Sequence, residues 1–316
     1  MKKIFFSICA LAAIVSCSKS EVIDAPGAGQ AISFDTYVGQ AAVTKATSVD
    51  TKEALQGAGF MAHSFNATDN TYHKSFNNEY VSDGDSGNWS YGSVEYWPNY
   101  ALDFVAYGKT ATVTESDDHK TITYDVPAVV ADQKDLIVAP YQKGKTYESG
   151  VVEFEFVHML SRIGYSVNVI GSNAVVISDV TLSGSFHTKG DVDLYTATPT
   201  IVGNGDAANT AYKLFAENQS YTFTPAEGAN TNIFVGEEAN RYMMIIPGDA
   251  DDYKVSVTYQ IGSETAVTKD FELGADFKFE AGKSYDFKFT VATNAIVFSA
   301  SVAEWGSTTS TPLAIG

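Results

Sequence analysis

Hydrophobic and polar residues alternate with a period of two along most of the chain after residue 31, and turn-forming residues recur between these runs. Side chains of a strand point alternately to two faces, so this alternation predicts β-strands joined by short turns. Long amphipathic helices are absent from the pattern, and 51–56 is expected to add one helical turn. The alternation predicts strands at 32–38, 59–63, 96–97, 102–106, 122–126, 136–139, 152–160, 163–169, 242–246, 255–261, 285–291 and 296–302.

The strand pattern predicts an all-β chain made of two tandem antiparallel β-sandwich domains. Residues 142–150 are polar and contain two glycines, so they are interpreted as the linker between the domains. The N-terminal domain is then 31–147 and the C-terminal domain 148–316. The inward-facing parity changes at Ser161–Arg162, which predicts a bulge or a passage from one sheet to another.

The first 30 residues differ from the rest. Lys2 and Lys3 precede an apolar run at 4–15 that is too short to span a bilayer, and small residues lead to Cys17. This layout predicts a signal peptide at 1–16 and a lipid on the Cys17 thiol, followed by a flexible tether at 17–30. An ordinary signal peptide with an incidental cysteine is the alternative.

Net charge and cysteine content limit which binding partners and cross-links the chain can have. The formal net charge of −18 opposes binding to DNA or RNA and electrostatic docking on anionic lipids. We therefore expect no nucleic-acid partner, and membrane attachment through the lipid alone. The two cysteines, Cys9 and Cys17, leave no intramolecular disulfide in a lipidated product. No later apolar run is long enough for a transmembrane helix.

No residue pattern predicts a metal site or a cofactor. The stretch 83–88 begins like a calcium loop, but Asn88 and Val94 stand where such a loop needs glycine and glutamate, which favours a hairpin tip. The histidines lack the close spacing of a zinc site and are expected to lie mostly on the surface. His158 is the exception, because its parity predicts a hydrogen-bonded core histidine. The five histidines are His63, His73, His119, His158 and His187.

Catalytic motifs are also absent. The chain has no Gly-x-Ser-x-Gly elbow, P-loop or dinucleotide fingerprint at a strand–helix junction, so we expect no catalytic residues and no enzyme activity. A pair of catalytic carboxylates assembled by the fold would not show in the sequence, so an extracellular hydrolase stays open as an alternative function. Tyrosines are plentiful, and an exposed row of them could stack on sugars.

The stretch from Phe154 to Val167, FEFVHMLSRIGYSV, resembles a core segment of the fimbrillin family, with Phe156, His158 and Ser161–Arg162 in the matching places. The first strand, the signal segment and three further stretches fit the same family in order, so the resemblance covers nearly the whole chain. The three stretches are 96–107, 135–139 and 282–305.

This resemblance implies a subunit of a type V pilus, or a related surface lipoprotein, at the outer membrane of a Gram-negative anaerobe. It implies two transthyretin-like β-sandwiches. Family members are exported as lipoproteins and cut after the first strand, and another subunit then fills the opened groove with a donated strand. Lys45 and Ala46 match the cut site, although Arg is common before the Ala and a plain solvated loop is the alternative.

The sequence does not decide which position the subunit would take in a fibre. The tail 306–316 offers only Leu313 and Ile315 as large apolar residues, so a tip, anchor or non-polymerising member fits as well as a stalk subunit. The implied partners are other pilin subunits, the membrane through Cys17, and a host or bacterial surface glycan or protein. A standalone surface lipoprotein that binds glycans is the alternative function.

Overall fold

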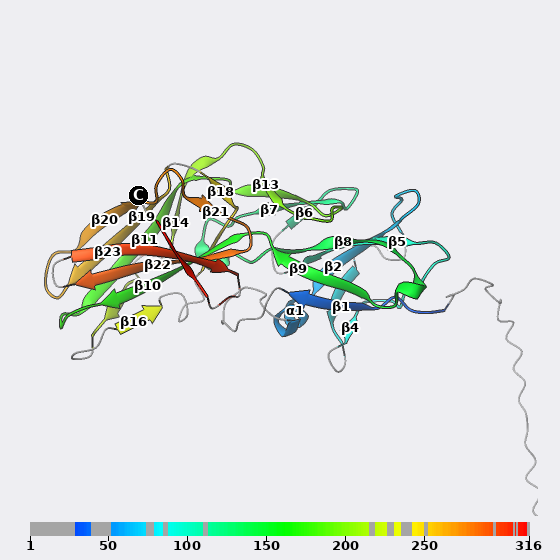
Figure 1. Cartoon of the computed structure of the whole chain (residues 1–316), viewed down its shortest axis with the longest axis horizontal. Helices are drawn as coiled ribbons and strands as arrows, with labels where there is room; N and C mark the ends of the chain where they lie inside the picture. The colour runs from blue at the N-terminus through cyan, green and yellow to red at the C-terminus, as the bar shows by residue number, and fades with distance from the viewer. Residues whose placement is uncertain are drawn as a thin grey trace, which may run out of the picture.

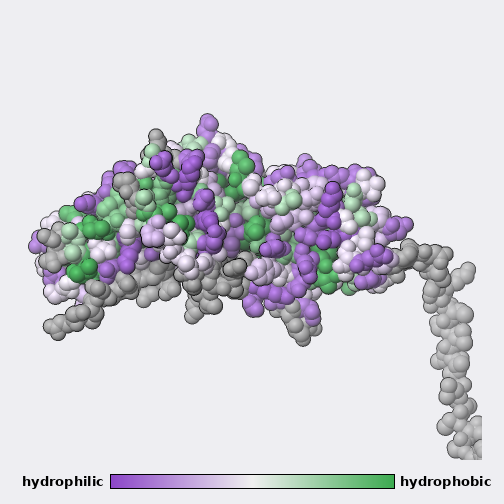
Figure 2. Space-filling model, viewed as in Figure 1, coloured by the Kyte–Doolittle hydropathy of each residue, from purple (hydrophilic) through white to green (hydrophobic). Residues whose placement is uncertain are grey.

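The computed structural model describes residues 29–38, 52–73, 79–84, 88–109, 113–214, 219–225, 231–234, 242–249, 252–292, 295–305, 307 and 309–314. These residues form an elongated body in which one group of sheets follows another along the long axis (Figure 1). Nearly all of the regular structure is β-strand, so the prediction of an all-β chain is confirmed. Figure 2 shows hydrophilic side chains over most of one face, with hydrophobic ones gathered mainly in the half that holds β22 and β23.

The first group contains a seven-stranded sheet and a four-stranded sheet. The order of the larger one is β1 (Phe34–Val38), β9 (Val152–His158), β8 (Ile137–Lys145), β5 (Leu102–Gly108), β2 (Phe60–Asn66), β3 (Glu79–Asp83) and β4 (Trp89–Ser90). The smaller one has the order β13 (Ile201–Gly203), β12 (Lys189–Asp193), β7 (Thr121–Asp125) and β6 (Val113–Glu115).

Both faces of the seven-stranded sheet are buried at its centre. Met61 and Phe65 of β2 join a core cluster that includes residues of the four-stranded sheet and of the second group of sheets. Phe60 and Ala62 of the same strand point the other way, into a separate cluster that includes residues of β1, β5 and β9. A strand buried on both faces loses the polar positions of a half-exposed strand, which explains why β5 reads LDFVAYG.

The second group packs a six-stranded sheet against a five-stranded one, with a small ladder of β18 (Gly248–Asp249) and β21 (Lys278–Phe279) at its side. The six-stranded sheet has the order β16 (Thr231–Phe234), β10 (Ser161–Val169), β22 (Lys283–Ala292), β23 (Ala295–Glu304) and β24 (Thr311–Leu313), with β17 (Met243–Ile245) also beside β10. The five-stranded sheet has the order β14 (Ala208–Lys213), β11 (Val175–Phe186), β19 (Lys254–Ile261) and β20 (Val267–Glu272), with β15 (Tyr221–Phe223) also beside β11.

Three short helices complete the regular structure of the described residues: α1 (Lys52–Ala58), η2 (Val130–Asp132) and η3 (Tyr147–Ser149). The helical turn expected at 51–56 corresponds to α1. The change of parity at Ser161–Arg162 is a passage between sheets, because β9 ends at His158 in the first group and β10 begins at Ser161 in the second.

The interpretation of 142–150 as an interdomain linker is wrong. These residues hold the end of β8 and the helix η3, and they connect β8 to β9, which pair with each other in the seven-stranded sheet. A cut between 147 and 148 therefore divides one sheet. The later strand β12 also pairs with β7 of the first group, so the chain crosses between the two groups more than once.

Two strand pairs depart from the predicted antiparallel arrangement. β1 pairs with β9 in parallel, and β10 pairs with β22 in parallel. Parallel neighbours need a long crossover connection, and more than a hundred residues separate the members of each pair. The strand predicted at 96–97 is reduced to an isolated bridge between Ala31 and Tyr96.

The helices of the described residues are all too short or too polar to span a bilayer.

Candidate functional site

β1 forms one edge of the seven-stranded sheet, where β9 is its strand neighbour. The register places Phe34 opposite Val152, Thr36 opposite Phe154 and Val38 opposite Phe156. Burial alternates strictly along the strand, with Phe34, Thr36 and Val38 facing inward. The sequence FDTYV produces this alternation directly, because every second side chain of a strand lies on the same face.

Phe34 fills the centre of an aromatic cluster under this edge. Its ring stacks on Phe154 at a centroid distance of 5.7 Å and meets Tyr91, Phe60 and Phe104 edge-on at 5.8, 6.0 and 6.0 Å. Such edge-to-face and offset arrangements add to the stabilisation that burial itself provides. Without β1, these four rings would line the bottom of an open groove, and we call them the aromatic floor.

The inward side chain at the middle of β1 lacks a hydrogen-bond partner. Thr36 is 7% exposed, and its hydroxyl has no hydrogen-bond partner among the described residues. A buried hydroxyl without a partner loses its hydration and receives nothing in exchange. The strand is therefore anchored by Phe34 and Val38, while the position between them weakens it.

The chain just before β1 is held from its other side. The Ile32 amide donates to the Glu95 carbonyl at 2.8 Å, and the Trp97 amide donates to the Gln30 carbonyl at 3.0 Å. The Tyr91 hydroxyl donates to the Ile32 carbonyl at 2.6 Å. The segment at 95–97 thus closes over the start of β1, which explains why its predicted strand appears as a single bridge.

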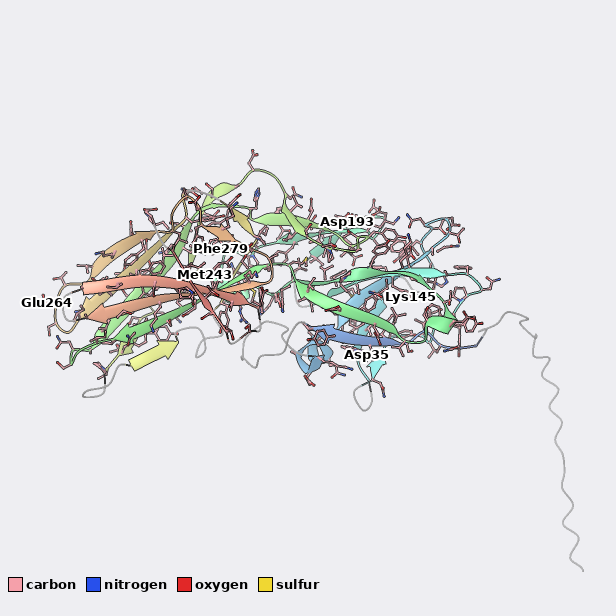
Figure 3. The ribbon with its side chains drawn as sticks, in the orientation of Figure 1. Asp35, Lys145, Asp193, Met243, Glu264 and Phe279 are labelled. Carbon is pink, nitrogen blue, oxygen red and sulfur yellow. The ribbon has the colours of Figure 1, made fainter. Side chains whose placement is uncertain are left out.

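The outer face of β1 is polar. Lys52 at the start of α1 donates to the Asp35 carboxylate at 2.6 Å, and this hydrogen bond holds the pKa of Asp35 below its usual range. A shallow hollow beside β1 is lined by Asp35, Lys52, Lys145 and Glu153, among others; Asp35 and Lys145 are labelled in Figure 3. This face therefore carries both signs of charge, in contrast to the apolar inner face.

The tail of the chain forms a second edge strand. β24 pairs with β23, with Leu313 opposite Ala300 and Thr311 opposite Val302. Leu313 is partly buried against the main core cluster, while Thr311 and Pro312 are exposed. The tail thus lies on its own sheet in this structure.

Between these edges, His158 lies in a buried cluster at the passage between the two groups of sheets. Its Nδ1 is 2.9 Å from Asp135 Oδ2, and its ring stacks on Trp305 at 4.2 Å. The Arg162 guanidinium lies over Trp305 at 4.9 Å and over Tyr242 at 4.7 Å. The prediction of a hydrogen-bonded core histidine is confirmed. No sequence pattern predicted Trp305 as its stacking partner.

Several residues singled out in the sequence lie outside the described residues. Cys17, Lys45 and Ala46 are among them. The last two belong to the connection between Val38 of β1 and Lys52 of α1. Sequence reasoning did not single out Tyr91, whose surroundings do not alternate, and it did not foresee that His63 is fully buried, contrary to the expectation of a surface histidine.

Comparison with known proteins agrees with this architecture. The chain is similar to a fimbrial protein from Bacteroides vulgatus, with a TM-score of 0.62, 20% identity and coverage of 87% of this chain and 99% of that one. It is also similar to a proposed cell adhesion protein from Bacteroides uniformis, with a TM-score of 0.56, 18% identity and coverage of 87% and 99%. No curated protein matches the chain.

Identities of this size show a shared fold, and the family follows from the sequence itself. The family model described as fimbrillin-like matches residues 44–305, which is most of the chain. The match includes the aromatic floor beneath β1 and the His158–Trp305 cluster, and it begins within the connection that follows β1. The chain belongs to the fimbrillin-like family.

Proposed function

We propose that this protein is a subunit of a cell-surface fimbria that assembles by strand exchange at the edge now occupied by β1. The observation that carries the proposal is the position of β1: an edge strand whose inward side chains cover a deep aromatic floor. A strand from another subunit with apolar residues at alternate positions would fit the same floor and extend the same sheet.

In this proposal, the precursor is exported with a signal at 1–16 and lipidated on Cys17 at the outer membrane, with 17–30 as its tether. A protease cuts between Lys45 and Ala46, and Cys17 and β1 then leave together. The position of this bond supports the order of events, because it follows β1 and precedes α1. An exposed sheet edge is prone to uncontrolled pairing with other strands. If β1 covers this edge until it is removed at the cell surface, pairing between subunits is confined to the cell surface.

A disulfide lock tests whether β1 must leave. Asp35 and Glu153 are direct partners on neighbouring strands, and adjacent strands lie close enough for a disulfide. Asp35→Cys with Glu153→Cys, in a chain carrying Cys9→Ser and Cys17→Ser, would hold β1 in place after the chain is cut. Following treatment with a trypsin-like protease, we expect the oxidised variant to stay monomeric and the reduced variant to form ladders on gels.

Two controls separate cleavage from exchange. Lys45→Ala should remove the cut and the ladders, whereas Lys120→Ala, which changes a lysine in another connection, should leave both unchanged. Ladders from the oxidised lock at the same yield as from the reduced form would show that β1 is not exchanged. A cut, reduced body that stays monomeric would exclude a stalk subunit and favour a tip or anchor.

A second candidate function, glycan binding, is favoured by one surface feature. A hollow at the end of the first group of sheets is lined by Tyr100 and Tyr147, with Asn99, Thr146 and Glu148 supplying polar groups. Aromatic faces beside hydrogen-bonding groups suit a sugar ring. Calorimetric titration with a polysaccharide panel should detect binding that Tyr100→Ala with Tyr147→Ala abolishes; no heat with any polysaccharide would remove this function.

A further inference from the structure

The fold brings His63 beside Glu115 and His119, which are four residues apart from each other but distant from His63 in sequence. His63 lies in β2 of the seven-stranded sheet, Glu115 ends β6 of the four-stranded sheet, and His119 lies in the turn between β6 and β7. One ligand atom from each side chain lies within 4.8 Å of the other two. This cluster therefore spans the two sheets of the first group.

The separations within the cluster suit a small metal ion. His63 Nε2 lies 3.4 Å from one Glu115 carboxylate oxygen, and His119 Nδ1 lies 2.7 Å from the other. Ligands of a tetrahedral zinc ion lie about 2.0–2.1 Å from the metal, which places them about 3.3 Å from one another. The three separations are at most 4.8 Å, so side-chain movements of about an ångström would let the three groups share one ion.

Neighbouring hydroxyl groups orient two of the three ligands. The Tyr72 hydroxyl lies 2.8 Å from His63 Nδ1, which leaves Nε2 as the nitrogen that faces Glu115. The Tyr107 hydroxyl donates to the Glu115 carboxylate. Metal-binding histidines commonly use their second ring nitrogen in this way, because the hydrogen bond fixes both the ring orientation and the tautomer.

His119 reaches the cluster through an unusual backbone conformation. Its φ is 57°, in the left-handed region that non-glycine residues seldom adopt. Its amide donates to the Ser116 carbonyl at 3.0 Å, and its ring stacks on Tyr72 at 4.6 Å and on His63 at 4.7 Å. The turn therefore directs the His119 ring inward rather than toward solvent.

Burial is graded across the cluster. The His63 side chain is fully buried, while Glu115 and His119 are 16% and 24% exposed. An ion could therefore enter from the side of His119, and a water molecule could supply a fourth ligand there. The donor set of two imidazoles and one carboxylate suits Zn²⁺ or a similar transition metal better than Ca²⁺ or Mg²⁺, which prefer oxygen ligands alone.

We propose that His63, Glu115 and His119 form a binding site for a divalent transition metal of the zinc type, which joins the two sheets of the first group. The sequence offered no zinc spacing, because 55 residues separate the two histidines and only the pairing of the sheets brings them together. With Cys9 and Cys17 as the only cysteines, a metal supplies a cross-link that disulfides cannot. This proposal stands independently of strand exchange.

The test is calorimetric titration of the purified full chain with ZnCl₂ after treatment with a chelator. We expect one ion per chain at a site that His119→Gln weakens at least 10-fold, since replacing even an orienting neighbour of a ligand costs about 10–100-fold. Tyr72→Phe should weaken it about 10-fold. His187→Gln is the matched control and should leave the affinity unchanged.

Two further measurements keep the outcome decisive. Circular dichroism of His119→Gln without metal should match the unchanged chain, because this side chain lies in a partly exposed turn. Titration with Co²⁺ should give the visible absorption of a tetrahedral site, and Glu115→Gln should abolish it. The proposal is overturned by a lack of stoichiometric Zn²⁺ binding, or by binding that His119→Gln and Glu115→Gln leave unchanged.

Discussion

Two edge strands of this molecule, β1 and β24, are fastened to their sheets very differently. β1 places three inward side chains over the seven-stranded sheet, and one of them, Phe34, contacts four aromatic rings. β24 has three residues, with Leu313 partly buried and the other two exposed. Both strands end a sheet, but burial makes β1 part of the core and leaves β24 a light addition to its surface.

This difference bears on how a subunit could exchange strands. A strand that seals a core leaves only when the chain behind it is cut or the core is disrupted. A short strand with one apolar anchor can detach at small cost in free energy and become available to another subunit. Substitutions on the two edges should therefore differ in their effect, and four of them test the comparison in order of decreasing size.

The largest effect is expected for Phe34→Ala. Removing a buried phenylalanine leaves a cavity and typically lowers the free energy of unfolding by about 3–5 kcal/mol. Urea denaturation followed by fluorescence would measure the change. Tyr37→Ala on the same strand is the control, since Tyr37 is 50% exposed and should change stability by at most about 0.5 kcal/mol. Equal losses would mean that β1 is not anchored through Phe34.

A smaller loss is expected for Leu313→Ala on the other edge. A fully buried leucine contributes about 1.5–3 kcal/mol, so this partly buried side chain should contribute about 1 kcal/mol. The same denaturation measurement applies, and hydrogen exchange should show faster exchange for the amides of Ala300 and Val302. A loss as large as that of Phe34→Ala would contradict the difference between the edges. Thr311→Ala serves as the exposed control.

A gain of stability is expected for Thr36→Val. Valine has nearly the same shape as threonine and lacks the hydroxyl that is buried without a partner, so the free energy of unfolding should rise by up to about 1 kcal/mol. Thr36→Ser keeps the hydroxyl and should give no gain. In the strand-exchange assay, the valine variant should assemble more slowly after cleavage. A destabilised valine variant would show that the hydroxyl is satisfied in solution.

The smallest effect is expected for Lys52→Ala, which removes the ion pair with Asp35. Both side chains are more than a third exposed, so screening by solvent limits the loss to about 0.5 kcal/mol or less. The pKa of Asp35 is lowered in the folded state, so this contribution is present above about pH 4 and fades as the pH falls further. The test compares urea denaturation at neutral pH with that in acid; a loss unaffected by acid would exclude the pair as its cause.

Alternation along the chain was enough to predict many of the strands. Apolar residues recur at every second position in β9, β10, β22 and β23, and the structure has strands at each of these places. β11 was not predicted, although it is the longest strand described. Its inward parity changes between Ile177 and Val180, where the register with β19 also shifts. A bulge inserts one residue and breaks the period of two on which such predictions depend.

Pairing between distant strands could not be read from the sequence. The end of β8 is polar because its side chains lie at the border of the sheet, so 142–150 looked like a linker. The pairing of β7 with β12 and the meeting of His63 with His119 depend on the same long-range arrangement. Local alternation carries no information about which strands become neighbours. For this reason the sequence predicted neither the pairing of β8 with β9 nor the proximity of His63 and His119.

The contacts of Trp305 with His158 and Arg162 have a mechanical consequence. Trp305 is buried immediately before the tail, and its amide donates to the Gly282 carbonyl at 2.8 Å. A pull on the end of the tail therefore first detaches β24 from β23, and the load then acts on the indole and its two neighbours, at the passage between the groups of sheets. The ten-pair ladder between β22 and β23 lies behind Trp305, so once β24 is detached a tensile load would reach the middle of the molecule before it could separate β23 from β22.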